Sequence, residues 1–241
     1  MRPAQAKEIN HPGEYKACMA LTREAPQEAF DKALGWRDLG GGDAAEHCLA
    51  AALIGLKQYR EAATRLEALA QKAKEEAPVK GGLLAQAAHA WLLAEQPSRA
   101  EQMLTVALKL TPDDSALYID RAQAKAGQND YQGALRDLNR SIELEDRRPD
   151  AYAFRATTNR FLGQFDLAIT DTERALALSP NHPDALLERG ILKRLRHDNV
   201  GARRDWLSVL RIAPESPAAE AARANLEKMD VKADDKPTGK P

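Results

Sequence analysis

Cysteine, aromatic residues and long apolar runs are all scarce in this chain of 241 residues. It contains two cysteines, and Phe, Trp and Tyr together make up 5% of it. No apolar run approaches the roughly 20 residues that a helix needs to cross a bilayer, and residues 1–9 lack the apolar core of a signal peptide. We therefore expect no membrane insertion, and either a protein that stays inside the cell or one whose signal has been removed.

Neither sign of charge dominates the composition. Lys and Arg number 35 and Asp and Glu number 36, which gives a formal net charge of −1. A dedicated nucleic-acid binder needs a strong basic surface to displace counterions from phosphates, so this balance argues against one. The sequence also has no CxxC pair, nucleophile motif, phosphate-binding loop or dinucleotide fingerprint. We therefore expect no cofactor, no metal and no enzymatic activity.

Alanine is abundant instead, and small residues recur with a period of 34. Ala-rich, Leu-rich segments favour helix, and no alternating strand segment flanked by turns is found. Four units begin at Gly81, Ser115, Pro149 and Pro183. Small residues, which let two antiparallel helices approach closely, occupy the eighth position of each unit (Ala88, Ala122, Ala156, Gly190) and the twentieth (Ala100, Ala134, Ala168, Ala202). Turns are expected at mid-unit, near Pro97, Asn129 and Gly163, and prolines near three unit ends stop the second helix.

This pattern of small residues, a mid-unit turn and a terminal proline resembles the tetratricopeptide repeat (TPR). The resemblance implies an all-α fold, a right-handed α-solenoid of about six helical hairpins. Two divergent repeats cover residues 10–80 and four regular ones cover 81–216. The second divergent repeat is about four residues too long, and we expect its second helix to extend through Lys72 to Glu76. A capping helix is expected at 217–229, a flexible N-terminus at 1–9 and a disordered tail at 230–241.

The two cysteines, Cys18 and Cys48, fall on the first helices of the two divergent repeats. They could form a disulfide or remain two buried thiols, and the sequence leaves both open. A metal site formed with His11 and His47 is less favoured, because the spacing is not a zinc pattern. The first two repeats also resemble those of exported bacterial TPR proteins. A periplasmic or exported location is expected if the cysteines are oxidised and a signal was removed, and a cytoplasmic one otherwise.

A second periodicity lies within the first and concerns charged residues. An Arg on the first helix and an Asp on the second recur at a constant separation in three successive units, as Arg121 and Asp137, Arg155 and Asp171, and Arg189 and Asp205. All six lie among apolar positions that should face the seam between the helices. Because buried charges are usually paired, we interpret them as structural ion pairs. The alternative is that the arginines clamp an acidic ligand.

The TPR resemblance implies a concave groove lined by the first helices of successive repeats. Carried over position by position, the groove contains Ala85, His89, Leu92, Ile119, Gln123, Ala126, Ala153, Thr157, Arg160, Leu187, Ile191 and Arg194. This surface is small and mildly apolar, which suits an inserted helix or an extended peptide. Arg160 and Arg194 add positive charge, so the ligand could carry acidic groups.

These residues predict a non-catalytic scaffold or adaptor that binds an unidentified protein or peptide. The groove lacks the multi-lysine clamp of chaperone-binding TPR domains, so that activity is not assigned. Self-assembly into homo-oligomers is the alternative, and an enzyme is the least favoured class. The densest basic cluster (Lys193, Arg194, Arg196, Arg203 and Arg204) is interpreted as a solvated helix face, partly neutralised by Asp198 and Asp205.

Overall fold

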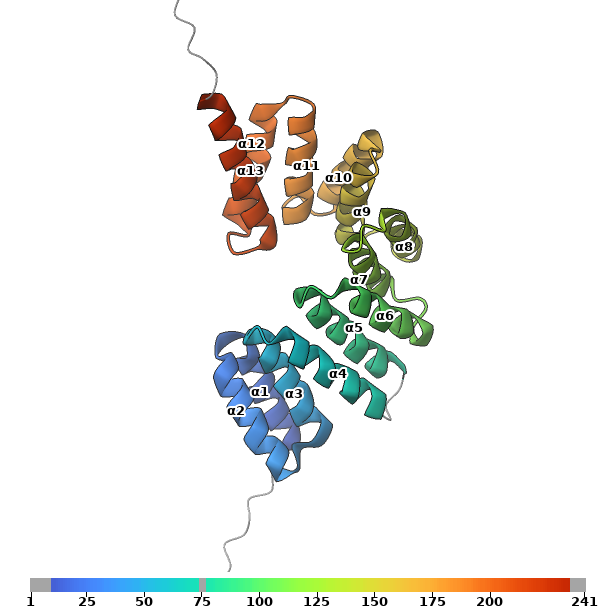
Figure 1. Cartoon of the computed structure of the whole chain (residues 1–241), viewed down its shortest axis with the longest axis vertical. Coiled ribbons are helices and arrows are strands. Elements are labelled where there is room, and N and C mark those ends of the chain that lie inside the picture. The colour runs from blue at the N-terminus through green and yellow to red at the C-terminus, as the bar shows by residue number, and fades with distance from the viewer. Residues whose placement is uncertain (1–9, 74–76, 235–241) are drawn as a thin grey trace, which may run out of the picture. The chain divides into compact units, whose positions relative to one another are not determined.

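The computed structural model describes residues 10–73 and 77–234, and the chain divides into two compact units (Figure 1). The first unit, which ends at Asp113, contains α1 (His11–Glu24), α2 (Pro26–Trp36), the short segment η1 (Arg37–Gly41), α3 (Gly42–Gly55), α4 (Tyr59–Lys72), α5 (Ala77–Leu93) and α6 (Pro97–Leu110). The second contains α7 (Ser115–Ala126), α8 (Tyr131–Leu144), α9 (Pro149–Phe161), α10 (Phe165–Leu178), α11 (Pro183–Leu195), α12 (Asn199–Ile212) and α13 (Pro217–Asp234). The predicted class, an all-α fold of repeated helical hairpins, is confirmed.

Consecutive helices pack as hairpins within each unit: α1 with α2, α3 with α4 and α5 with α6, then α7 with α8, α9 with α10 and α11 with α12. The small residues at the eighth and twentieth repeat positions are buried between the paired helices. Gly190 illustrates why they must be small, because a Cβ there would overlap the indole of the fully buried Trp206. Close approach of the two helices therefore depends on these positions.

The turn inside each hairpin after the first has a recurring backbone conformation. One residue adopts a positive φ between 57° and 74° in every case, at Lys57, Glu95, Asn129, Gly163 and His197. The last four of these occupy the same position in successive repeats, so one turn geometry recurs. Only one of these residues is a glycine, for which this conformation costs least.

The extra residues of the second divergent repeat lie in a different helix from the one predicted. Helix α4 ends at Lys72, and Ala73 has left the helical region with a ψ of 125°. Helix α5 begins at Ala77, four residues before the repeat start expected at Gly81. The expected extension of α4 through Lys72 to Glu76 is therefore wrong, and the additional residues form a first turn of α5.

The C-terminal helix packs against α11 and α12 and covers the last hairpin. Ala219, Ala222 and Leu226 of α13 join Trp206 in one apolar cluster. The helix continues to Asp234, so the residues at 230–234, expected in a disordered tail, are helical. The flexible terminus expected at 1–9, the rest of the tail (235–241) and the loop residues 74–76 lie outside the described residues. No helix in the described part of the chain has the length and apolar character needed to span a bilayer.

Candidate functional site

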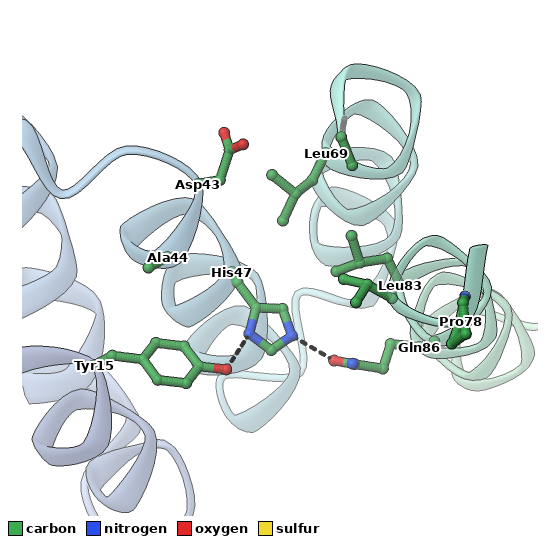
Figure 2. A pocket seen from close by; sticks show the side chains of 11 residues that line it. Tyr15, Asp43, Ala44, His47, Leu69, Pro78, Leu83 and Gln86 are labelled. Carbon is green, nitrogen blue, oxygen red and sulfur yellow. Dashed lines mark hydrogen bonds between the residues drawn. The ribbon is translucent and has the colours of Figure 1, made fainter. Parts of the chain in front are cut away.

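A pocket of about 350 Å³ opens in the first unit, between α3 on one side and α4 and α5 on the other (Figure 2). Its apolar walls come mainly from α4 and α5, where the side chains of Leu69 and Leu83 are buried and Val79 is 51% exposed. Eleven described residues line it: Tyr15, Asp43, Ala44, His47, Leu69, Ala73, Pro78, Val79, Gly82, Leu83 and Gln86.

The pocket exists because α5 departs from the regular repeat. Helix α5 packs along α4 and α6, whereas α3 and α5, the first helices of their hairpins, make few backbone contacts with each other. The additional first turn of α5 carries Pro78 and Val79, which form part of the wall. Insertions in repeat proteins often map to a binding face, and this one builds the pocket directly.

A chain of polar side chains connects α1, α3 and α5 along one side of the pocket (Figure 2). The Tyr15 hydroxyl lies 2.8 Å from His47 Nδ1, and His47 Nε2 lies 2.8 Å from Gln86 Oε1. Burial raises the pKa of the Tyr15 hydroxyl, which keeps it protonated and able to donate. When Tyr15 donates to Nδ1, the Nε2–H of a neutral His47 donates to Gln86, so one tautomer satisfies both contacts.

A disulfide between Cys18 and Cys48 lies directly beside this polar chain. Cys18 follows Tyr15 by one helical turn on α1, and Cys48 follows His47 on α3. The Cα atoms of the two cysteines are 6.2 Å apart, and both residues are fully buried in a cluster with Ala33 and Leu49. Two cross-links, one covalent and one hydrogen-bonded, thus hold α1 and α3 together where they line the pocket.

The histidines and cysteines considered for a metal site are engaged in other contacts. The cysteines are joined to each other, Trp36 Nε1 donates to His11 Nδ1 at 3.1 Å, and His47 contacts Tyr15 and Gln86. Within the described residues, no three His, Cys, Asp or Glu side chains are grouped so that they could hold a metal ion. Sequence reasoning did not identify the pocket, because Tyr15, His47 and Gln86 come from three separate hairpins.

The predicted groove residues are placed on the first helices of their hairpins, but they differ in exposure. Three lie on α5 in the first unit (Ala85, His89 and Leu92), and the other nine lie on α7, α9 and α11 in the second. His89 is exposed, whereas Ile119 and Ala153 are 4% and 1% exposed and pack into the core. These two positions therefore cannot contact a ligand, since their side chains face neighbouring helices. The remaining nine are partly buried.

Part of the expected positive charge of the groove is neutralised within the second unit. Arg160 of α9 forms an ion pair with Glu188 of α11, which is 2% exposed, and Thr157 donates to the same carboxylate at 3.0 Å. Arg194 donates to the backbone carbonyl of Asn225 in α13 at 3.3 Å. The expectation that Arg160 attracts an acidic ligand is therefore wrong, because its charge is paired with Glu188. For Arg194 the expectation stays a prediction, because a backbone carbonyl does not neutralise its charge.

The recurring arginine and aspartate residues are brought together in all three hairpins. In each hairpin the arginine Nη2 donates to Oδ1 of the aspartate and Nε donates to Oδ2. The Nη2–Oδ1 distance is 2.7 Å for Arg121 and Asp137, 2.6 Å for Arg155 and Asp171, and 2.7 Å for Arg189 and Asp205. The aspartates are at most 5% exposed. These are bidentate contacts between the two helices of one hairpin.

Each aspartate also contacts a second side chain from the first helix, which the sequence did not lead us to expect. It lies four residues after the arginine, on the same helix, and is Lys125, Asn159 or Lys193. The Nζ atoms of Lys125 and Lys193 lie 2.7 and 2.8 Å from the aspartate, and Asn159 Nδ2 lies 3.0 Å from Asp171. Polar residues recur at this position with the repeat period, which was a signal in the sequence, but the change from Lys to Asn at position 159 obscured it.

The basic cluster of the last hairpin is largely neutralised. Lys193 contacts Asp205, Arg196 contacts Asp166 at 2.7 Å, and Arg203 contacts Asp230 of α13. Asp198 instead accepts from the Gly201 amide at the start of α12, so its main contact is a helix cap. Burial acts to raise the pKa of Asp205, but the hydrogen bonds from Arg189 and Lys193 outweigh it and lower that pKa.

Acidic side chains gather near the beginnings of α7, α9 and α11 in the second unit. Burial, with Asp114 and Asp150 adding to it, raises the pKa of Asp120 to about 6. His182 donates from Nε2 to Asp150 at 2.9 Å while its Nδ1 accepts from the Ala185 amide, and this contact lowers the pKa of Asp150.

Comparison with solved structures identifies the fold. MamA, residues 41 to the end, from Desulfovibrio magneticus RS-1 is 14% identical, with a TM-score of 0.61 over 73% of this chain and 99% of that chain. A thermophilic TPR protein from Thermus thermophilus is 19% identical, with a TM-score of 0.61 over 75% and 98%. A chain of the APC/C hetero-tetramer Cut9–Hcn1 is 15% identical, with a TM-score of 0.65 over 89% of this chain and 43% of that one.

No protein-family model and no curated protein matches the sequence. At these identities the structural likeness concerns the fold, which is that of TPR proteins. The fold predicted from the repeat period is therefore confirmed.

Proposed function

We propose that this TPR protein is a non-catalytic scaffold that binds a segment of another protein through the pocket between α3 and α5. The observation that carries the proposal is an apolar pocket built by an irregularity in an otherwise regular repeat. Its walls offer apolar surface that an inserted side chain would remove from water. The pocket also lies on the first helices of their hairpins, where TPR proteins present their grooves.

The chemistry of the pocket favours binding over catalysis. Tyr15, Asp43 and His47 are the only residues of nucleophile type among the eleven described lining residues, and Tyr15 and His47 are hydrogen-bonded to each other. His47 uses both ring nitrogens in hydrogen bonds to Tyr15 and Gln86, so it is held as a structural link. A solved TPR domain of RPAP3 is described as bound to an HSP90 peptide, but our proposal rests on the pocket of this chain.

Two glycines provide a matched test of the proposed site. Gly82 in the pocket and Gly35 on α2 are both exposed and helical, and a Cβ at either position meets no atom within 4 Å. Gly82→Trp should fill the pocket without disturbing the backbone, whereas Gly35→Trp places the same side chain elsewhere on the unit. Proteins captured from the native organism by the wild type should be retained by Gly35→Trp and lost by Gly82→Trp. Equal capture by both variants would show that the pocket is not the site.

Self-assembly is a second candidate, favoured by exposed apolar residues at the hairpin turns of the second unit. Phe161, Phe165, Leu195 and Val200 are 46–73% exposed, and Tyr131 stacks on Phe161 with ring centroids 4.7 Å apart. Sedimentation over a wide concentration range tests this candidate. A protein that remains monomeric at the highest concentration would eliminate it.

The disulfide supports a location in an oxidising compartment, such as the periplasm, as expected for an exported protein. Thiol counting on protein recovered from its native source under acid quench and non-reducing conditions tests this part of the proposal. Two free thiols per chain would indicate a reducing compartment.

A further inference from the structure

We propose that the pocket between α3 and α5 binds a large apolar side chain on a segment that carries a basic residue beside it. This inference rests on the proposed function and adds the chemistry of the partner. Three features of the pocket lead to it: the composition of its walls, an unused amide donor on α5 and an uncompensated carboxylate on α3.

The walls select an apolar side chain. The lining includes Ala44, Leu69, Pro78, Val79 and Leu83, and none of these side chains can form a hydrogen bond. A volume of about 350 Å³ is at the lower end of the range for ligand pockets. It therefore suits one inserted side chain rather than a whole helix, and the gain comes from the apolar area removed from water.

Gln86 supplies a donor that can fix the backbone of the inserted segment. Its Oε1 faces His47 Nε2 at 2.8 Å, which assigns the amide orientation and leaves Nε2 turned away from the histidine. That Nε2 has no hydrogen-bond partner among the described residues, and the side chain is exposed. A backbone carbonyl next to the inserted side chain is the acceptor that this amide can reach.

Asp43 determines the charge of the partner. It is the only Asp, Glu, Lys or Arg among the eleven described lining residues. It lies in the first turn of α3, at the positive end of the helix, and it is exposed. Asp43 makes no ion pair or hydrogen bond with any described side chain. A Lys or Arg beside the inserted residue would supply the missing counter-charge.

Three short peptides test the inference on the whole protein. The probes are acetylated and amidated pentapeptides: Ser-Lys-Leu-Lys-Ser, the same peptide with both lysines replaced by Glu, and the lysine peptide with Ala in place of Leu. Binding is followed by the NMR shifts of the Gln86 side-chain amide and the Leu83 methyl groups. The lysine peptide should bind about three- to tenfold more tightly than the glutamate peptide at low salt, and this preference should shrink as salt is added. The alanine peptide should bind more weakly than the leucine peptide of the same charge.

Two variants separate this inference from the proposed function. Asp43→Asn should abolish the preference for lysine over glutamate, whereas Gly82→Trp should abolish binding of all three peptides. If the wild type binds the lysine and glutamate peptides equally, or if Asp43→Asn keeps the preference, the basic neighbour is wrong and the pocket remains the proposed site. If no peptide gives saturable shifts at millimolar concentration, the peptide chemistry is wrong. The capture experiment with Gly82→Trp and Gly35→Trp then decides the proposed function independently.

Discussion

Replacing Arg155 by alanine should destabilise the protein more than the same change at Arg121 or Arg189. Asp171, which is 4% exposed, accepts hydrogen bonds from Arg155 Nε and Nη2 at 2.9 and 2.6 Å, and its remaining donor is the neutral amide of Asn159 at 3.0 Å. Arg155→Ala therefore leaves a buried carboxylate without the only cation that contacts it among the described residues. The three hairpins thus form an internal comparison, in which the third donor is a lysine beside Asp137 and Asp205 and a neutral amide beside Asp171.

The magnitude follows from what remains around each carboxylate. Removing one partner of a buried ion pair costs about 3–5 kcal/mol when the other charge is left uncompensated, and this is the loss expected for Arg155→Ala. In the flanking hairpins Lys125 and Lys193 remain within 2.8 Å of the aspartate. The expected loss there is about 1–3 kcal/mol, close to that of hydrogen bonds to a charged group.

Urea unfolding followed by circular dichroism measures these differences. Because hairpins of a repeat protein can unfold separately, native-state amide exchange in α9 and α10 provides the local readout. Asn159→Lys introduces the lysine that the flanking hairpins already have, so it should recover part of the stability lost in Arg155→Ala. Replacing both partners, Arg155→Met with Asp171→Leu, should be far less destabilising than Arg155→Ala alone, since no unpaired charge is then buried.

Equal losses for the three arginine variants would refute this reasoning, because they would show that the third donor does not compensate the aspartate. Failure of Asn159→Lys to improve the stability of Arg155→Ala would do the same. A stability of Arg155→Ala indistinguishable from that of the wild type would show that the ion pairs are not structural at all.

Two further predictions concern other parts of the chain. Replacing Cys18 and Cys48 together by serine should lower the free energy of unfolding by up to about 3–4 kcal/mol, because the disulfide closes a long loop. Urea titrations should show this difference under oxidising conditions and a smaller one with a dithiol reductant present, because buried serine hydroxyls still cost stability relative to thiols. Asp120→Asn should stabilise the protein near neutral pH, where the ionised carboxyl is disfavoured, since the folded-state pKa of about 6 lies above the ordinary value of 3.8. The advantage of the asparagine variant should shrink as the pH falls through about 6 and vanish below about 4, and a pH-independent difference in urea midpoint would contradict it.

The features that the sequence could predict are those that repeat within one hairpin. Arg155 and Asp171 lie on the two helices of a single hairpin, so their constant separation along the chain suffices to pair them. Small residues at fixed positions likewise describe one local packing arrangement. Both kinds of feature are determined by residues close in sequence, and the repeat displays them several times.

Contacts between hairpins were harder to predict. Arg160 was assigned to a ligand because its partner, Glu188, lies outside its own hairpin, on the first helix of the next one. The repeat period does not show such a pair, since it occurs at one place and depends on how neighbouring hairpins stack. The additional turn of α5 was also mispredicted. The excess of four residues was visible in the sequence, but Ala, Lys and Glu around the loop are good helix formers and fit either helix. The signal for a new helix was Pro78, since proline is favoured in the first turn of a helix and disfavoured in its interior.

The pocket is found where repetition fails, and there is a physical reason for this. Elsewhere in the chain the first helices of adjacent hairpins pack against each other, as α1 does against α3 and α9 against α11, which leaves little apolar surface for a partner. Between α3 and α5 that packing is replaced by a single hydrogen bond, from His47 to Gln86, and the disulfide secures α3 to α1 on its other side. Apolar surface that a regular joint would bury therefore stays open beside a rigid support, so a bound side chain gains area burial without the cost of reorganising the helices.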